Sequence, residues 1–252
     1  MGFSKILVSL SVAALALFAA PAVAQNKPLP WDGRGQDITV ATLEKKFLLH
    51  IFKQKPNGGV GNPADWVTVQ QKGRSPAYNN DTGVINIAVD NKSIFGGQMN
   101  FRRSELVQNV AGAGTTFFRA SIMANEVLKN KYFWQVFFPE SHSWEVFVDA
   151  NSSPMKIQFR TEARVQWETA FTTKTWFNFG IAVTGSGTTL YTSTGNAALS
   201  KAWSASRPNG SNGEELHFGL LTLSNDGSQP KMAPGQDILS FNGVSVENRV
   251  TL

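Results

Sequence analysis

Two glutamates lie where alternating, strand-like sequence could place them to exchange protons. Arg103 and Glu105 are two residues apart, so in a β-strand they share one face, and the guanidinium would hold the carboxylate ionised. Glu145 follows further along the chain, flanked by large apolar residues, and burial there would favour its protonated form. The pattern predicts one base and one acid. Each glutamate also has an ordinary explanation, as half of a cross-strand ion pair or as a solvent-facing strand residue.

Two histidines and a tryptophan are candidates for contacts beside these carboxylates. Alternation puts His217 on the face opposite to its apolar neighbours, together with Gly219, which leaves room for a ligand to approach the strand. His142 and Trp144 lie just before Glu145, and an aromatic ring exposed there would stack on a sugar. The ordinary alternatives are a solvated histidine and a tryptophan in the core.

Two carboxyl groups on neighbouring strands of one sheet are the minimum for hydrolysis of a glycosidic bond. One protonates the leaving oxygen, and the other activates water or attacks the sugar. Such a pair requires a sheet that brings distant segments of the chain side by side. The rest of the chain must therefore supply the strands of that sheet.

Composition limits the class of protein. With 252 residues, 42% of them hydrophobic and only 16% charged, the chain suits one or two globular domains. It contains no cysteine, which excludes disulfides, cysteine–zinc sites and thiol catalysis, and its 3 histidines argue against a multi-histidine metal site. The chain is mildly basic, with a net charge of +5 and a pI of about 9.5. Its lysines and arginines do not form a basic cluster, so we expect no nucleic-acid partner.

Strand-like runs separated by turn residues predict an all-β fold. We expect a single-domain β-jelly roll of two packed antiparallel sheets, with few short helices and as a monomer. Helices are expected only at Thr39–Phe52, starting with a Thr39 cap, and at Asn196–Trp203. The predicted strands are Val67–Gln70, Val84–Val89, Gln98–Leu106, Thr116–Met123, Phe133–Phe138, Trp144–Asp149, Met155–Glu168, Trp176–Val183, Thr188–Ser193, Leu216–Leu223 and Asp237–Val250.

The N-terminus has the pattern of a secretory signal peptide. Lys5 precedes an apolar run over 6–20, and Ala22-Val23-Ala24 offers the small residues of a cleavage site. We expect cleavage after Ala24, secretion of a domain over 25–252, and no membrane association after cleavage. Four acceptor tripeptides fit a eukaryotic secretory route, at Asn80, Asn91, Asn151 and Asn209.

No cofactor or metal is expected from the sequence. Glycosidic hydrolysis by a carboxyl pair needs neither. A structural calcium ion is possible in jelly rolls, but the chain has no aspartate-rich loop with suitable ligand spacing.

Four segments together resemble glycoside hydrolase family 131, a family of secreted β-glucanases from fungi and related organisms. The resemblance runs from about Trp31 to the C-terminus and implies a β-jelly roll with a broad open cleft, acting on β-1,3-, β-1,6- and β-1,4-glucans with inversion. It implies that Glu105 and Glu145 are the catalytic pair, with Arg103 and His217 lining the site. The segments are Trp31-Asp32-Gly33-Arg34, Phe101-Arg102-Arg103-Ser104-Glu105-Leu106, Ser141–Asp149 and Leu216-His217-Phe218-Gly219.

Two other functions remain open at this point. A polysaccharide lyase on the same fold would act on an acidic polymer, which the basic pI suits, with His142 as base and Arg103 neutralising the carboxylate. A non-catalytic protein would bind β-glucan through exposed aromatic rings without cleaving it. Unsaturated products would indicate a lyase. Retention on the polymer without new reducing ends would indicate a binding protein.

Overall fold

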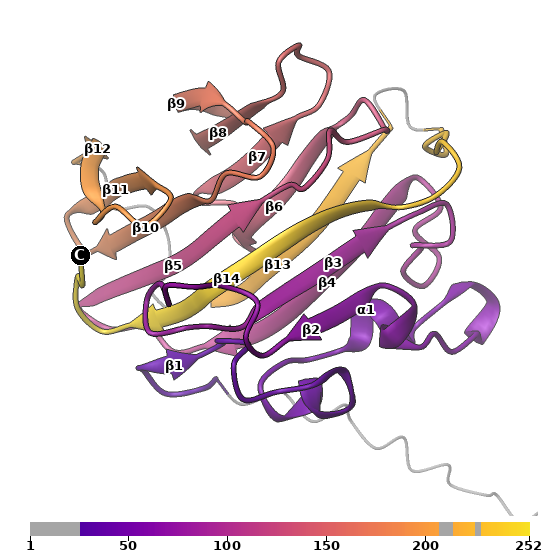
Figure 1. Ribbon diagram of the computed structural model, residues 1–252, viewed down its shortest axis with the longest axis horizontal. Coiled ribbons are helices and arrows are strands. Elements are labelled where there is room, and N and C mark those ends of the chain that lie inside the picture. The colour runs from indigo at the N-terminus through magenta and orange to yellow at the C-terminus, as the bar shows by residue number, and fades with distance from the viewer. Residues whose placement is uncertain (1–25, 207–213, 225–227) are drawn as a thin grey trace, which may run out of the picture.

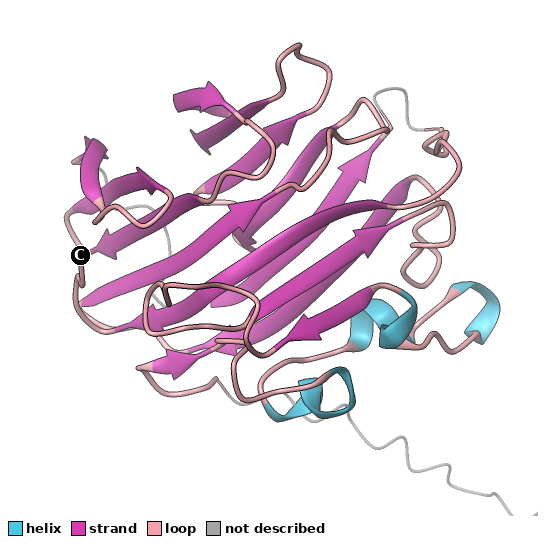
Figure 2. Ribbon diagram, viewed as in Figure 1, coloured by secondary structure: helices cyan, strands magenta, loops and turns pink. Residues whose placement is uncertain are grey.

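Two packed antiparallel sheets form nearly all of the computed structural model, which describes residues 26–206, 214–224 and 228–252 (Figures 1 and 2). This confirms the predicted all-β fold. The predicted signal peptide and the acceptor Asn209 lie outside the described residues. Within the described ranges, no helix has the length and apolar character needed to cross a membrane.

Each sheet is built from strands that are distant in sequence. One contains β1 (Trp31–Asp32), β2 (Val67–Gln70), β3 (Val84–Val89), β5 (Thr115–Met123), β10 (Phe177–Thr184), β11 (Gly187–Thr194), β12 (Ser200–Ala205) and β14 (Asp237–Glu247). The other contains β4 (Phe101–Val110), β6 (Phe133–Pro139), β7 (Glu145–Asp149), β8 (Lys156–Thr161), β9 (Arg164–Ala170) and β13 (Glu214–Leu223). The eight-stranded sheet has the order β12-β11-β10-β5-β14-β3-β2, with β1 beside β14, and the six-stranded sheet has the order β4-β13-β6-β7-β8-β9.

The core lies between the sheets and is rich in aromatic rings. Phe218 of the six-stranded sheet meets Phe241 of the eight-stranded sheet with ring centroids 5.3 Å apart, and Trp144 meets Phe118 at 5.1 Å. Full burial of a side chain of this kind stabilises the fold by about 1.5–3 kcal/mol. Since alternate strand residues point in opposite directions, this packing leaves the other face of each sheet toward solvent.

The short helices differ from those predicted. The segment Thr39–Phe52 forms two short helical pieces, η1 (Val40–Lys45) and α1 (His50–Lys53), instead of one helix. Thr39 is the N-cap residue of η1, and its backbone N–H donates to Thr42 Oγ1 at 2.9 Å, which is the reciprocal bond of a capping box. Two further 3₁₀ turns, η2 (Pro56–Gly58) and η3 (Pro63–Asp65), follow, and all four lie together along one side of the molecule (Figure 2).

Two predicted elements were wrong. Met155–Glu168 is a hairpin of β8 and β9, because Glu162 and Ala163 adopt positive φ angles of 50° and 59° and turn the chain. Asn196–Trp203 is not a helix, and its second half belongs to β12, where Trp203 pairs with Leu190 of β11. Pairing with a neighbouring strand overrides the weak helical preference of this segment.

Candidate active site

Charged residues gather on the outer face of the six-stranded sheet, across β4, β13, β6 and the start of β7. Core residues such as Leu106 and Phe218 point to the other sheet, so their alternate neighbours point outward. Glu105 pairs in register with Gly219, and His217 pairs with Phe138 on its other side. The register therefore brings Glu105 and His217 together from segments 112 residues apart.

Glu105 is fully buried and bound through both oxygens. Arg103 donates from Nε to Oε1 at 2.7 Å and from Nη2 to Oε2 at 2.9 Å, which is a two-pronged ion pair. His217 Nδ1 lies 2.8 Å from Oε2. Burial acts to raise the pKa of Glu105, but Arg103 and His217 outweigh it and lower the pKa to about 2. The carboxylate is therefore ionised, as the spacing of Arg103 and Glu105 predicted.

His217 lies between three carboxylates. Its Nε2 atom is 3.2 Å from Glu140 Oε2 and 3.2 Å from Glu215 Oε1. Neither oxygen lies in line with the Nε2–H bond, so these contacts are ion pairs without a directed hydrogen bond. Burial acts to lower the pKa of His217, but Glu105, Glu140 and Glu215 raise it to about 10. The imidazole is therefore charged at neutral pH.

The pKa shifts of Glu105 and His217 predict maximal stability between pH 4.5 and pH 6.5. The pKa of Glu105 is below its ordinary value of 4.5, so its contribution is lost as the pH falls from 4.5 toward 2. The pKa of His217 is above its ordinary value of 6.5, so its contribution is complete below pH 6.5 and is lost as the pH rises toward 10. Urea unfolding should show this alkaline decline, and His217→Gln should reduce it. An equal decline in both proteins would contradict the charge state assigned to His217.

Glu145 lies in a second cluster beside the first. Its Oε1 atom accepts from Gln135 Nε2 and lies 2.8 Å from His142 Nδ1. The hydrogen bond to Glu145 raises the pKa of His142, against the opposing effect of burial. The Glu145 side chain is 11% exposed, and its hydrogen bonds with Gln135 and His142 both involve Oε1, which leaves Oε2 for a ligand.

Phe138 lies between the two clusters. Its ring stacks on His217 at a centroid distance of 4.9 Å and on His142 at 5.6 Å, each at an angle of 10°. The stacked rings hold both imidazoles in fixed orientations. Glu105 and Glu145 therefore belong to one continuous row, but each has its own histidine.

The outer face continues with polar side chains beyond Glu145. Arg160 lies over the Phe147 ring at 4.9 Å, and Gln158 Nε2 donates to Glu168 at 2.9 Å. Lys156 pairs with the same glutamate at 2.5 Å. These residues extend the polar surface over β7, β8 and β9, long enough for more than one sugar unit.

The predicted site residues separate into those on this face and one that is not. Arg103, Glu105 and His217 contact one another, and His142 contacts Glu145. Trp144 is 1% exposed and packs between the sheets, so the prediction that it binds substrate was wrong. The run that carries it alternates, and placing Glu145 on the outer face necessarily puts Trp144 in the core.

Three residues of the site were missed. Glu215 is two positions before His217, so strand alternation alone could have placed it on the same face. Glu140 follows the end of β6 in a turn and has no periodic signal. His50 of α1 has a pKa below its ordinary value, chiefly because it is buried. The charge of Glu215 acts to raise this pKa, and the charge of His217 acts to lower it. The position of His50 depends on how α1 packs against β4, which the sequence does not indicate.

One group of the described residues has the donor types and spacing to hold a metal ion. The ligand atoms of Glu140, Glu215 and His217 lie within 4.8 Å of one another. Carboxylate oxygens and an imidazole nitrogen suit a divalent cation. Binding would require loss of the Nε2 proton, which the surrounding carboxylates instead stabilise. Glu140, Glu215 and His217 are therefore best described as an ion-pair cluster.

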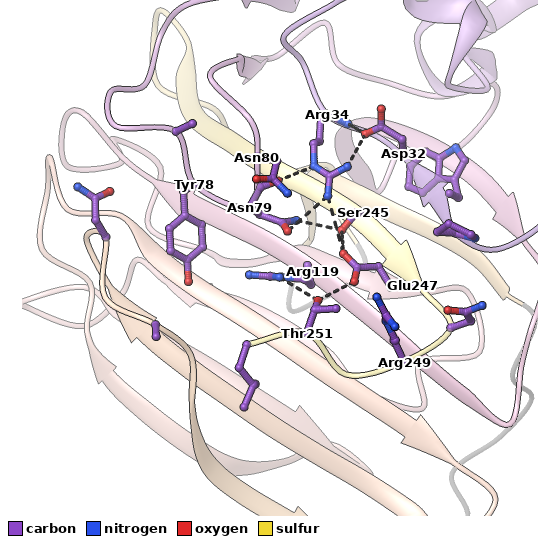
Figure 3. Close-up of a pocket in the computed structure, with 17 residues that line it drawn as sticks. Asp32, Arg34, Tyr78, Asn79, Asn80, Arg119, Ser245, Glu247, Arg249 and Thr251 are labelled. Carbon is purple, nitrogen blue, oxygen red and sulfur yellow. Dashed lines mark hydrogen bonds and ion pairs between the residues drawn. The ribbon is translucent and has the colours of Figure 1, made fainter.

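Two hollows, of about 750 and 760 Å³, lie on the opposite side of the molecule, on the outer face of the eight-stranded sheet. The first is drawn in Figure 3 and is lined by three arginines and two acidic residues, which are Arg34, Arg119, Arg249, Asp32 and Glu247. Many of these groups bond to one another. Arg34 Nε donates to Asn79 O at 2.6 Å, and Thr251 bridges Arg119 and Glu247 (Figure 3).

Comparison with known sequences identifies one family. Residues 29–251 match the model of the glycoside hydrolase 131 catalytic N-terminal domain, which is nearly all of the described chain. Among curated protein sequences, none matches at a significant level.

Solved structures with the same fold agree with this match. The chain is similar to the catalytic domain of a family 131 β-glucanase from Podospora anserina, with a TM-score of 0.72 and 21% identity, over 88% of this chain and 96% of that one. It is equally similar to the family 131 catalytic domain from Coprinopsis cinerea, with a TM-score of 0.70 and 21% identity, over 88% and 94% of the chains. An alginate lyase of polysaccharide lyase family 7 has a TM-score of 0.51 at 13% identity, over 73% and 82%, which reflects a shared jelly-roll fold.

Proposed function

Because the chain belongs to glycoside hydrolase family 131, we propose that it hydrolyses β-glucans on the outer face of its six-stranded sheet. Family membership makes it a glycoside hydrolase. The proposed substrates are β-1,3-, β-1,6- and β-1,4-linked glucans, cleaved with inversion, as the family resemblance implies. The observation that carries the proposal is the row of Glu105, His217, His142 and Glu145 on one open sheet face.

Glu145 is proposed as the general acid. Its Oε1 atom is held by Gln135 and His142, which leaves Oε2 for the glycosidic oxygen. The proton that Oε2 gives to the leaving oxygen is replaced there from water. The charge left on Glu145 in the meantime is balanced by His142, which lies 2.8 Å from Oε1 and has a half-exposed side chain. Protonation of the leaving oxygen by a positioned acid accelerates such reactions by about 10²- to 10⁴-fold.

Glu105 is proposed to support the base of the reaction as a positioning residue, acting through His217. Arg103 and His217 enclose both oxygens of Glu105, so this carboxylate cannot contact a substrate directly. It acts on groups at the surface only through the His217 imidazolium that it holds. The imidazolium in turn lowers the pKa of Glu140 and Glu215, whose side chains are 63% and 31% exposed. One of these two ionised carboxylates would accept the proton of the attacking water. Glu105 is then a positioning residue.

Product analysis tests this function. Incubation with a β-1,3/1,6-glucan and with a β-1,4-glucan should generate new reducing ends, and alginate should give no unsaturated product. Proton NMR recorded early in the reaction should show the α-anomer first if the bond is inverted. Reducing ends that appear as the β-anomer would contradict inversion, and no cleavage of any glucan would contradict the substrate class.

The lyase alternative is not favoured by the arrangement of tyrosines. Tyr78 bonds to Ser193 and lines the hollow of Figure 3, and Tyr191 packs on Phe117, both at the eight-stranded sheet. Tyr132 donates to the carbonyl of Lys231 and packs against the core. Among the described residues, none of the three contacts His142 or Arg103, the base and the neutralising group of that alternative, and Arg103 is already bound to Glu105 through two N–H groups. An absorbance rise with alginate would reverse this conclusion.

We also propose that the protein is secreted as a glycoprotein and acts as a monomer. Asn80, Asn91 and Asn151 are exposed, which glycosylation requires. Mass spectrometry of the secreted protein before and after glycosidase treatment would test both the cleavage site and the glycans.

A further inference from the structure

The second hollow on the eight-stranded sheet runs across four strands and differs in chemistry from the first. Its floor is formed by outward-facing residues of β5, β14, β3 and β2, and its volume is about 760 Å³. The loop after β5 and the segment before β14 border it. We call it the rear groove. Its floor and borders include Thr68, Gln70, Asn86, Met123, Trp176, Gln236, Ile238 and Ser240.

The floor of the rear groove is a ladder of neutral polar side chains in register. Ser240 is paired with Asn86, and Asn86 with Thr68, on successive strands. Ser240 Oγ donates to Asn86 Oδ1 at 2.7 Å, and Asn86 Nδ2 donates to Thr68 Oγ1 at 3.1 Å. The chain of bonds leaves the Thr68 hydroxyl proton and one Asn86 N–H available. These are groups that bond to sugar hydroxyls.

The strand spacing gives this ladder the right repeat for a polysaccharide. Neighbouring strands lie about 4.8 Å apart, which is close to the length of one glucosyl unit in an extended β-glucan. A chain lying across β14, β3 and β2 would therefore meet an equivalent polar group at each unit. Apolar side chains lie beside the ladder, with Ile238 44% exposed and Val127 56% exposed. They match the apolar faces of the sugar rings.

An aromatic ring forms the end of the rear groove. Trp176 is partly exposed and lines it, while the Arg74 guanidinium lies over the same ring at 4.6 Å from its centroid. Arg74 also lies over Tyr78 at 4.5 Å, so it is held between two rings and separates the two hollows. The Trp176 ring is thereby fixed in place at the groove, as a stacking surface must be.

The two hollows differ in the charged side chains that line them, and therefore in the charge of the ligand that each could bind. In the rear groove, Asp237 already accepts from Lys129 N and Asn130 N, and Glu126 and Lys129 offset each other on the rim. In contrast, the hollow of Figure 3 is lined by arginines and carboxylates that mostly bond to one another. A neutral polymer is matched by the first and not by the second.

We propose that the rear groove is a second, non-catalytic binding site for a β-glucan chain. It lies on the sheet opposite to Glu105 and Glu145, so one polymer strand can be held there while another is cleaved. The choice of glucan as ligand rests on the proposed function. The stacking ring is Trp176, and the hydrogen-bonding ladder is Thr68, Asn86 and Ser240.

Binding to insoluble β-1,3/1,6-glucan and β-1,4-glucan tests the proposal in the full chain carrying Glu145→Gln. Trp176→Ala in this background should reduce the fraction bound, with about tenfold weaker retention, as expected when a stacking ring is truncated. Ile238→Glu should act in the same direction by placing a charge in the groove without removing a buried ring. Val60→Glu changes a side chain that is 86% exposed and lies outside both hollows, and it should have no effect.

The same substitutions in the active protein separate this site from the catalytic one. Trp176→Ala and Ile238→Glu should leave kcat on soluble glucan oligosaccharides unchanged. Unchanged retention in both variants would overturn the rear groove, as would retention that is lost in Arg249→Ala and kept in the groove variants. Retention that depends on Trp176 in a protein that cleaves no glucan would instead overturn the proposed function and leave the groove intact.

Discussion

Replacing Glu145 by glutamine is expected to lower kcat on β-glucan by about a thousandfold. Glutamine keeps the size of the side chain but cannot donate an acidic proton to the leaving oxygen. The unfolding midpoint should change little, because glutamine keeps an oxygen that can bond to Gln135 and to the half-exposed His142. The measurement is the release of reducing ends, together with urea unfolding of the same preparation.

Glu44→Gln is the matched control for this change. Glu44 is an exposed glutamate of η1 that pairs with Lys53, away from the active face. Its replacement should leave kcat unchanged. Full activity of Glu145→Gln would remove Glu145 from the mechanism.

Replacing Glu105 by glutamine is expected to affect both stability and activity. Arg103 and His217 are buried beside this carboxylate and would lose their opposite charge. Removal of one member of a buried ion pair costs about 3–5 kcal/mol, so the urea midpoint should fall strongly. Because the pKa of His217 would fall, it would lose its proton at a lower pH, and the alkaline limb of kcat should move down the pH scale. A purely structural role would not move that limb.

A double variant separates the two effects of Glu105. Arg103→Met combined with Glu105→Gln removes two of the three buried charges and leaves His217 with Glu140 and Glu215 as partners, so much of the lost stability should return. Activity should not return, since His217 still lacks the carboxylate at Nδ1. A stable double variant with wild-type kcat would show that the buried pair serves the fold alone.

Strand alternation predicted most of this site. It placed Arg103 and Glu105 on one face and His217 on the face away from the core, and the structure has them there. The same rule assigned Trp144 to the core, and its proposed contact with substrate ignored that assignment. Local sequence therefore predicts which face a strand residue occupies, because the period of the strand is regular.

Strand alternation does not predict which strands are neighbours in the sheet. That β13 lies between β4 and β6 depends on the order of strands in the sheet, and no local signal in Glu214–Leu223 encodes it. The Phe138 stack and the position of Glu140 depend on that order and on the turn after β6. The hairpin at Glu162 and Ala163 was missed because neither residue is a usual turn former, although both have positive φ.

The position of β13 constrains the order in which the protein can fold. Glu105 and His217 are separated by 112 residues, and β4 and β6 are joined only through β13. Contacts of such high sequence separation form late, because the entropy of closing a long loop opposes them. Until β13 inserts, β4 and β6 each present an unpaired edge, and the Arg103–Glu105 pair has no imidazole beside it. During synthesis the proposed catalytic face therefore stays incomplete, and exposed to aggregation, until β13 has left the ribosome.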